Sequence, residues 1–247
     1  MIKQLLSALV LSAVALASSA GNIPDPLRIA TEGAYPPFNG VDANGKLIGF
    51  DVDIAMALCK EMNANCELVA QDWDGIIPAL VANKYDAIIA SMSITDERKK
   101  TIDFTNKYYS NYLAIIGEKG KIAGTNDLAG KVVGAQRSTL ASQWAEDNLM
   151  GKADVKLYDT QTAAYADLSA GRLEAMVSDI YPAMDWLKDN SSYELSGNAI
   201  DINDQIGIGI RQGESDLKAA FNKAIDAIRT NGTYAKINAK YFSADIY

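Results

Sequence analysis

Polar and aromatic side chains follow several short apolar runs of this sequence, at the points where the runs stop. Glu32 and Tyr35 follow "LRIA", Ser91 and Ser93 follow "DAIIA", and Asp179 follows "EAMVS". Trp73, Arg98, Ser138 and Thr139 belong to the same group. Two acids, one arginine, hydroxyl groups and two aromatic rings, in a chain without histidine, are a poor inventory for general acid–base catalysis. They favour binding of a zwitterion that carries an extra positive charge.

Strands and helices alternate in the segments that position these residues. Apolar residues recur at helical spacing in "DVDIAMALCKEMN", whereas "YDAIIA" is typical of a buried strand. The alternation indicates parallel pairing, because parallel strands need a crossover element between them. Ligands of such sheets bind beyond the carboxyl ends of the strands, where the polar residues lie. The predicted strands are 27–32, 66–71, 85–90, 131–136, 154–159, 173–178 and 205–210, and the predicted helices are 51–63, 73–84, 138–149 (capped by Ser138), 162–171, 215–232 and 233–242.

The two halves of the chain repeat this order. "ALVANKYDAIIAS" (79–91) aligns without a gap with "DLSAGRLEAMVSD" (167–179), which sets Asp86 over Glu174. We therefore predict two similar α/β lobes. The strand-like run "YYSNYLAII" (108–116) connects them, and the chain crosses back if its last helices pack on the first lobe. Two crossings make a hinge that permits closure and restricts twisting.

The first twenty residues have the features of a secretory signal peptide. Lys3 precedes an apolar run that ends in small residues, which predicts cleavage after Ala20. A membrane anchor is the alternative, but the run is shorter than the roughly 20 apolar residues that span a bilayer. Cleavage removes one lysine and changes the net charge from −8 to −9 over 227 residues. We expect an exported, soluble protein whose acidic surface excludes nucleic acid as a partner.

Two cysteines, Cys59 and Cys66, are the only cysteines of the chain. In an exported protein this pair predicts a disulfide between the end of one helix and the start of the next strand. A metal site is the alternative, but two thiols without histidine are too few ligands. We expect no metal and no cofactor.

The sequence resembles the periplasmic amino-acid-binding proteins of ABC transporters, in particular the group that binds lysine, arginine, ornithine and histidine. The matching stretches are "ATEGAYPPF", "GFDVDIAMALCKEM", "AQDWDGIIPAL", "KYDAIIASMSITDERKKTIDFTNKYY", "AGRLEAMVSD" and "RTNGTYAKINAKYF". The resemblance implies a type II periplasmic-binding-protein-like fold with two Rossmann-like lobes. Lobe 1 is expected at 21–110 and 201–247, lobe 2 at 111–200, and the hinge segments near 110–113 and 197–202.

The resemblance also implies a role for each polar residue. Arg98 grips the ligand α-carboxylate with help from Ser93 and Thr139, because a guanidinium binds a carboxylate through two hydrogen bonds. Asp179 accepts the α-ammonium, and the ligand then bridges the lobes and favours closure. The remaining implied ligand-binding residues are Glu32 for the distal cation, Tyr35 and Trp73 flanking the side chain, and Ser91, Met92, Gln136 and Ser138 in the pocket wall.

Each of these residues also has an ordinary structural explanation. The alternatives are a surface ion pair for Arg98, helix caps for the hydroxyls and Asp179, core packing for the aromatic rings, and a solvated loop for Glu32. Ala90 stands where some relatives have serine, and Arg137 where many have glycine. Three roles are open to Arg137: to repel a basic ligand, to pair with an acid across the lobes, or to bind an additional carboxylate of an opine-like arginine conjugate.

We therefore expect a periplasmic receptor for a basic amino acid, arginine above lysine, ornithine or histidine. It would act as a monomer that delivers its ligand to an inner-membrane ABC permease. One alternative is an enzyme on the same scaffold, a dehydratase of prephenate or arogenate, but the chain offers no unassigned acid for that step. Receptors for a neutral polar amino acid, and a sensor module that presents the same cleft to a receptor kinase, are further alternatives.

Overall fold

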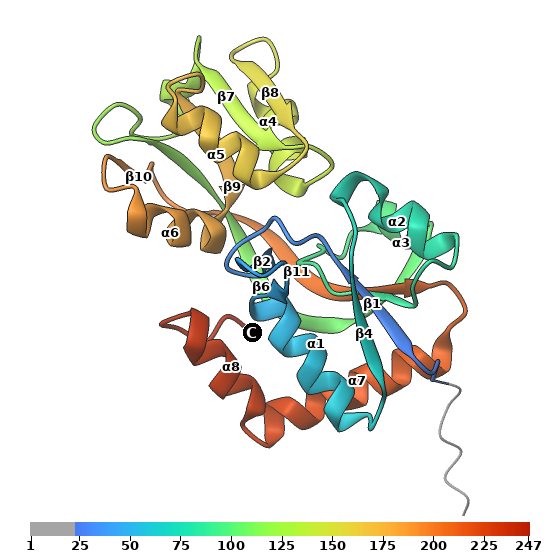
Figure 1. Ribbon diagram of the computed structural model, residues 1–247. Helices are drawn as coiled ribbons and strands as arrows, with labels where there is room; N and C mark the ends of the chain where they lie inside the picture. Colours follow the sequence, from blue (N-terminus) through green and yellow to red (C-terminus); the bar gives the residue numbers. More distant parts are fainter. Residues whose placement is uncertain (1–22) are drawn as a thin grey trace, which may run out of the picture.

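The computed structural model describes residues 23–247 and is shown in Figure 1. The predicted signal peptide, 1–20, lies outside these residues. Two α/β lobes are arranged one above the other, and the strands β6 (Ile102–Glu118) and β11 (Ile200–Arg211) run between them. Across residues 23–247, no helix combines the length and the apolar character that a membrane crossing requires.

The lower lobe in Figure 1 is built around the parallel strand order β4-β1-β5. Its helices α1 and α7 each bury an apolar face, and α7 does so through Leu217, Phe221 and Ile225 at helical spacing. The elements of this lobe are β1 (Leu27–Thr31), β2 (Gly40–Val41), β3 (Leu47–Ile48), α1 (Phe50–Glu61), β4 (Cys66–Ala70), α2 (Trp73–Val81), β5 (Ala87–Ile88), α3 (Asp96–Lys99), α7 (Ser215–Thr230) and α8 (Thr233–Tyr241).

The upper lobe repeats the parallel arrangement in the order β9-β7-β8. Its core lies between this sheet and the helices α4, α5 and α6, as two apolar clusters that contain Val133, Val177, Leu168 and Met176. The elements are η1 (Thr125–Leu128), β7 (Val132–Gln136), α4 (Leu140–Leu149), β8 (Asp154–Tyr158), α5 (Gln161–Ser169), β9 (Ala175–Asp179), α6 (Ile180–Asp189) and β10 (Tyr193–Leu195).

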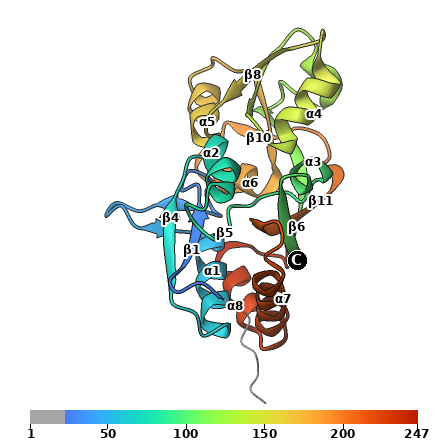
Figure 2. The same cartoon turned by 90° about the vertical axis from the view of Figure 1, so that its right-hand side faces the viewer.

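The strands β6 and β11 join the two sheets. They pair with each other in antiparallel fashion, β11 also pairs with β5, and β6 also pairs with β9. In the turned view of Figure 2 they again run between the lobes. The resulting order, β4-β1-β5-β11-β6-β9-β7-β8, makes one continuous sheet with a two-strand connection. The predicted α/β fold with two lobes is confirmed.

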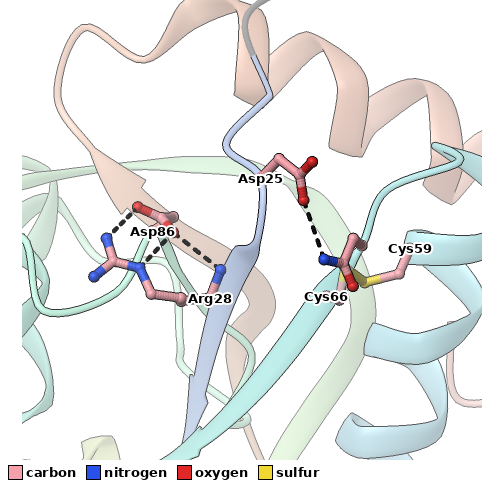
Figure 3. The surroundings of a disulfide bond; sticks show 6 residues. Asp25, Arg28, Cys59, Cys66 and Asp86 are labelled. Carbon is pink, nitrogen blue, oxygen red and sulfur yellow. Dashed lines mark hydrogen bonds and ion pairs between the residues drawn. A yellow bond between two sulfur atoms is a disulfide. The ribbon is translucent and has the colours of Figure 1, made fainter.

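The internal repeat of the sequence has a counterpart in the structure. Asp86 accepts a hydrogen bond from the backbone N–H of Arg28 at 3.0 Å and pairs with its guanidinium at 2.9 Å (Figure 3). Glu174, the aligned residue, accepts from the backbone N–H of Val132 at 3.0 Å and pairs with Lys131 at 2.8 Å. In each lobe, an acid before the inner strand thus fixes the start of the neighbouring strand.

The predicted disulfide is present. Figure 3 shows Cys59 in α1 bonded to Cys66 at the start of β4. Their Cα atoms lie 6.2 Å apart. It connects the end of a helix to the following strand, as the sequence indicated.

Candidate functional site

A cavity lies between the two lobes, with about 310 Å³ of empty space that includes the solvent at its mouth. Its position follows from the topology, because the strands of both lobes end there: Glu32 follows β1, Gln136 ends β7 and Asp179 ends β9. The residues that line it are Glu32, Tyr35, Trp73, Ala90, Ser91, Ser93, Arg98, Gln136, Thr139, Leu140 and Asp179. The structure therefore brings both predicted acids, the arginine and both aromatic rings to one place.

Glu32 is a buried carboxyl group with one direct partner from the other lobe. Its Oε1 accepts a hydrogen bond from Nε2 of Gln136 at 2.8 Å, and only 9% of the residue is exposed. Burial raises the pKa of Glu32 to about 7, and the hydrogen bond from Gln136 opposes this rise. The solvated-loop alternative for Glu32 is therefore wrong. A cation placed beside this carboxyl group would lower its pKa again.

Asp179 and Tyr35 meet across the cleft. The Tyr35 hydroxyl donates a hydrogen bond to Oδ2 of Asp179 at 2.6 Å. Asp179 occupies the position before α6, but its side chain caps no backbone N–H within residues 23–247. Burial and the nearby charge of Asp204 both raise the pKa of Asp179. Its carboxylate therefore faces the cleft and does not cap helix α6.

Arg98 lies on the short helix α3, whose N-cap is Thr95. The Thr95 hydroxyl accepts a hydrogen bond from the backbone N–H of Arg98 at 3.1 Å. Its guanidinium donates to the carbonyl oxygens of Ser93 at 2.8 Å and of Ser138 at 2.9 Å. The guanidinium carbon lies 5.3 Å from the centre of the Trp73 ring. Burial lowers the pKa of Arg98 to about 10, so it stays charged at neutral pH. An ion pair of Arg98 with a surface acid is absent among the described residues.

Several hydroxyl groups of the cavity have protein partners. Ser91, at φ 54°, donates through Oγ to Oδ2 of Asp51 at 2.9 Å. Thr139 caps α4, where its Oγ1 accepts the backbone N–H of Ser142 at 3.1 Å. The prediction that Ser138 caps this helix is wrong. Ser138 adopts φ 60°, and its hydroxyl donates to Asp74 at 3.2 Å, across the cleft.

Three of the predicted residues do not line the cavity: Met92, Arg137 and Ser138. The Met92 side chain is fully buried among apolar residues of the lower lobe. Arg137 forms ion pairs with Asp159 at 2.9 Å and, across the cleft, with Asp74 at 3.8 Å. Of its three open roles, pairing with an acid across the lobes is the one that this geometry supports. Ser138 contributes its backbone carbonyl, which accepts from Arg98 and, at 3.3 Å, from the Trp73 indole.

Sequence reasoning missed residues that support the cavity. Leu140, in the first turn of α4, lines it directly. Asp51 is fully buried and accepts hydrogen bonds from Asn39 at 2.9 Å and from Tyr108 at 2.8 Å, and burial raises its pKa to about 6. Asp204, on β11, lies behind the site. A carboxylate that starts an apolar helix, as in "FDVDIAMALCK", was the available signal for Asp51.

Metal binding finds no support within residues 23–247, which hold no group of three side chains of the ligating types. The polar groups of the cavity suit an organic ion. Two buried carboxyl groups, Glu32 and Asp179, and the guanidinium of Arg98 line it and carry a net negative charge when all are ionised. Such a site stabilises a small molecule with more positive than negative charge.

Two α/β lobes on a two-strand connection, with a polar cavity between them, define a two-lobed solute-binding protein. The chain belongs to the bacterial extracellular solute-binding proteins, family 3, whose sequence pattern matches residues 27–244. It is 44% identical to the L-arginine-binding protein of Pseudomonas aeruginosa over 98% of this chain and 97% of that protein. It is 39% identical to the lysine/arginine/ornithine-binding periplasmic protein of Escherichia coli over 94% of this chain and 93% of that protein.

Among solved structures, an ancestral arginine-binding protein bound to arginine superimposes with a TM-score of 0.85 and 37% identity. The match covers 90% of this chain and 100% of that chain. All three relatives are named as binding proteins. They support the interpretation of this chain as a binding protein and not as a dehydratase.

Proposed function

We propose that the protein binds a basic L-amino acid, with arginine preferred, in the cleft between the lobes, and delivers it to an ABC importer of the inner membrane. One observation carries this proposal: Arg98, Asp179 and Glu32 line a single buried cavity. An α-amino acid with a cationic side chain offers one anionic and two cationic groups. Each of them has a partner of opposite charge in this cavity.

The proposed roles divide the cavity between the head group and the side chain of the ligand. Arg98 and the amino end of α4 hold the α-carboxylate, because backbone N–H groups at a helix start favour an anion. Asp179 accepts the α-ammonium. Tyr35 and Trp73 flank the ligand side chain, where a flat guanidinium gains stacking and cation–π attraction. Glu32 meets the distal cation.

Closure of the two lobes on the ligand follows from this division. Residues of the upper lobe, Gln136 and Asp179, already hydrogen-bond to Glu32 and Tyr35 of the lower lobe. A ligand that contacts both lobes links them through its own charged groups and thereby favours the closed state. We place lobe 1 at 21–110 and 201–247 and lobe 2 at 111–200. The protein acts in the periplasm as a monomer after cleavage behind Ala20.

Calorimetric titration of the ligand-stripped protein with arginine, lysine, ornithine, histidine and glutamine tests this proposal. We expect arginine to bind most tightly at pH 8 and glutamine to bind about 10- to 150-fold more weakly, because a neutral side chain forgoes the charged hydrogen bond to Glu32, which contributes about 1.5–3 kcal/mol. Tight binding of glutamine together with indifference to arginine would overturn it.

A further inference from the structure

Asp204 is a buried acid that makes none of the proposed contacts with the ligand. It lies on β11 where this strand passes between the lobes, and only 4% of it is exposed. The pairing of β11 with β6 is irregular between Ile200 and Asp204, and Asn203 adopts φ 53°. Irregular strand positions re-aim side chains and are frequent beside binding sites. Here the irregularity turns a carboxylate into the interior.

The hydrogen bonds of Asp204 are incomplete. Its Oδ2 accepts from Nδ2 of Asn111, the residue opposite it on β6, at 2.8 Å. Within residues 23–247, Oδ1 of Asp204 and Oδ1 of Asn111 are both buried without a hydrogen bond of ordinary geometry, although the Ser93 hydroxyl lies near enough to Asp204 to lower its pKa. Two unpartnered acceptors in one buried place are costly, and they attract positive charge to their surroundings.

Arg98 and Asp179 are the charged groups that lie close to this carboxylate. The segment of Ser93 pairs with β11 directly after Asp204, because Ile94 donates its backbone N–H to the carbonyl oxygen of Gln205 at 2.8 Å. Ser93 in turn accepts from Arg98. Burial lowers the pKa of Arg98, and the charge of Asp204 opposes this; burial, and then the charge of Asp204, raise the pKa of Asp179; burial raises the pKa of Asp204 itself.

We infer that Asp204, through Asn111 and Asp179, makes an α-ammonium group on the ligand a requirement for tight binding, although it does not line the cavity. This inference rests on the proposed function and adds a specificity-determining residue to it. Asp179 alone offers one negative charge to the ammonium. With Asp204 near it, the empty site holds two acids that repel each other when both are ionised, and a cation placed beside Asp179 relieves that repulsion.

The decisive comparison uses L-arginine and 5-guanidinopentanoic acid, which is arginine without its α-amino group. Both have the carboxylate for Arg98 and the guanidinium for Glu32, so their affinity ratio isolates recognition of the ammonium. The test is to measure this ratio by calorimetry at pH 8 for the wild type and for Asp204→Asn, which keeps the shape of the side chain. Asp201→Asn, an exposed acid on the same strand, is the control with the same change of charge.

The expected result is that Asp204→Asn lowers the preference for arginine about tenfold or more, the order of effect of one unit charge several ångströms away at an effective dielectric constant near 20. The pH below which arginine affinity declines should also move down, because the pKa of Asp179 falls when its neighbour loses its charge. Asp201→Asn should alter neither. An unchanged ratio in Asp204→Asn would overturn the inference.

A measurement on the wild type covers the case in which Asp204→Asn does not fold. Carboxyl ¹³C resonances of Asp204 and Asp179 should move toward their ionised positions on arginine binding, and less on binding of 5-guanidinopentanoic acid. An Asp204 resonance that responds equally to both ligands would also defeat the inference. If the wild type binds neither compound, the proposed function fails instead, so the two failures are distinguishable.

Discussion

Replacement of Glu32 by glutamine tests the assigned role of this buried acid most directly. The substitution keeps the size of the side chain, and its amide oxygen still accepts the hydrogen bond from Gln136. Only the negative charge is lost. The fold should therefore survive, and a change in ligand binding then reports the charge.

The magnitude follows from the burial of the carboxyl group. A hydrogen bond to a charged group contributes about 1.5–3 kcal/mol, which corresponds to about 10- to 150-fold in arginine affinity. Glu32, with a pKa of about 7 in the empty site, is about half protonated at pH 7, which removes about twofold from the wild-type affinity at that pH. The full effect is expected at pH 8.

The same pKa sets the pH dependence of binding. A cationic ligand lowers the pKa of Glu32, so binding below pH 7 requires a proton to leave. Arginine affinity of the wild type should be nearly constant above pH 7 and should fall as pH decreases below it, with a contribution from Glu32 of up to about tenfold per unit. Glu32→Gln removes that contribution, and its profile should be shallower.

Calorimetry at pH 8 and pH 6 with arginine and citrulline, its neutral isostere, measures both effects. The wild type should prefer arginine, and Glu32→Gln should lose most of this preference. Glu67→Gln, an exposed acid on β4, is the matched control. If Glu32→Gln bound arginine within threefold of the wild type at pH 8 and kept the preference over citrulline, the role given to Glu32 would be refuted.

Three further outcomes are expected. Arg98→Lys should weaken arginine binding about 10- to 100-fold in calorimetry, because an ammonium cannot hold a carboxylate with two parallel hydrogen bonds; a loss below threefold would contradict the assignment. Arg137→Ala should leave arginine affinity within about threefold of the wild type, because this side chain pairs with acids outside the cavity wall; a larger loss would indicate that Arg137 contacts the ligand. The ligand-free protein should melt at a lower temperature at pH 8 than at pH 5.5. The raised pKa of Glu32, about 7 when folded, adds stability that is complete below its unfolded pKa near 4.5 and is lost as pH rises through 7. Glu32→Gln should reduce that difference, and an equal or larger difference would count against the raised pKa.

The grouping of the cavity residues was predictable because it depends on the order of elements alone. Alternating strands and helices imply parallel strands, and parallel strands end on the same edge of a sheet. Glu32, Gln136 and Asp179 all end strands or follow them, so sequence order was enough to bring them together. The disulfide was predictable for a similar reason, since its cysteines are close along the chain.

The partners of individual groups were not predictable in this way. The hydroxyl of Ser91 donates a hydrogen bond to Asp51, which is forty residues away along the chain. Ser138 adopts a left-handed backbone conformation, and Thr139 caps the helix instead. Such pairings depend on backbone angles and on how the lobes meet, neither of which has a period in the sequence. Asp204 escaped notice because an irregular strand, not a pattern, turns it inward.

Direct bonds across the cleft have a consequence for the speed of capture. Three hydrogen bonds join the lobes through groups that a bound amino acid would also need: Glu32 with Gln136, Tyr35 with Asp179, and Arg98 with Ser138. A ligand can enter only when these hydrogen bonds are broken. The association rate is therefore expected to scale with the fraction of the empty protein that is in the open state. Mutations that strengthen these hydrogen bonds would therefore slow association of the ligand, even if every contact between the protein and the bound ligand is unchanged.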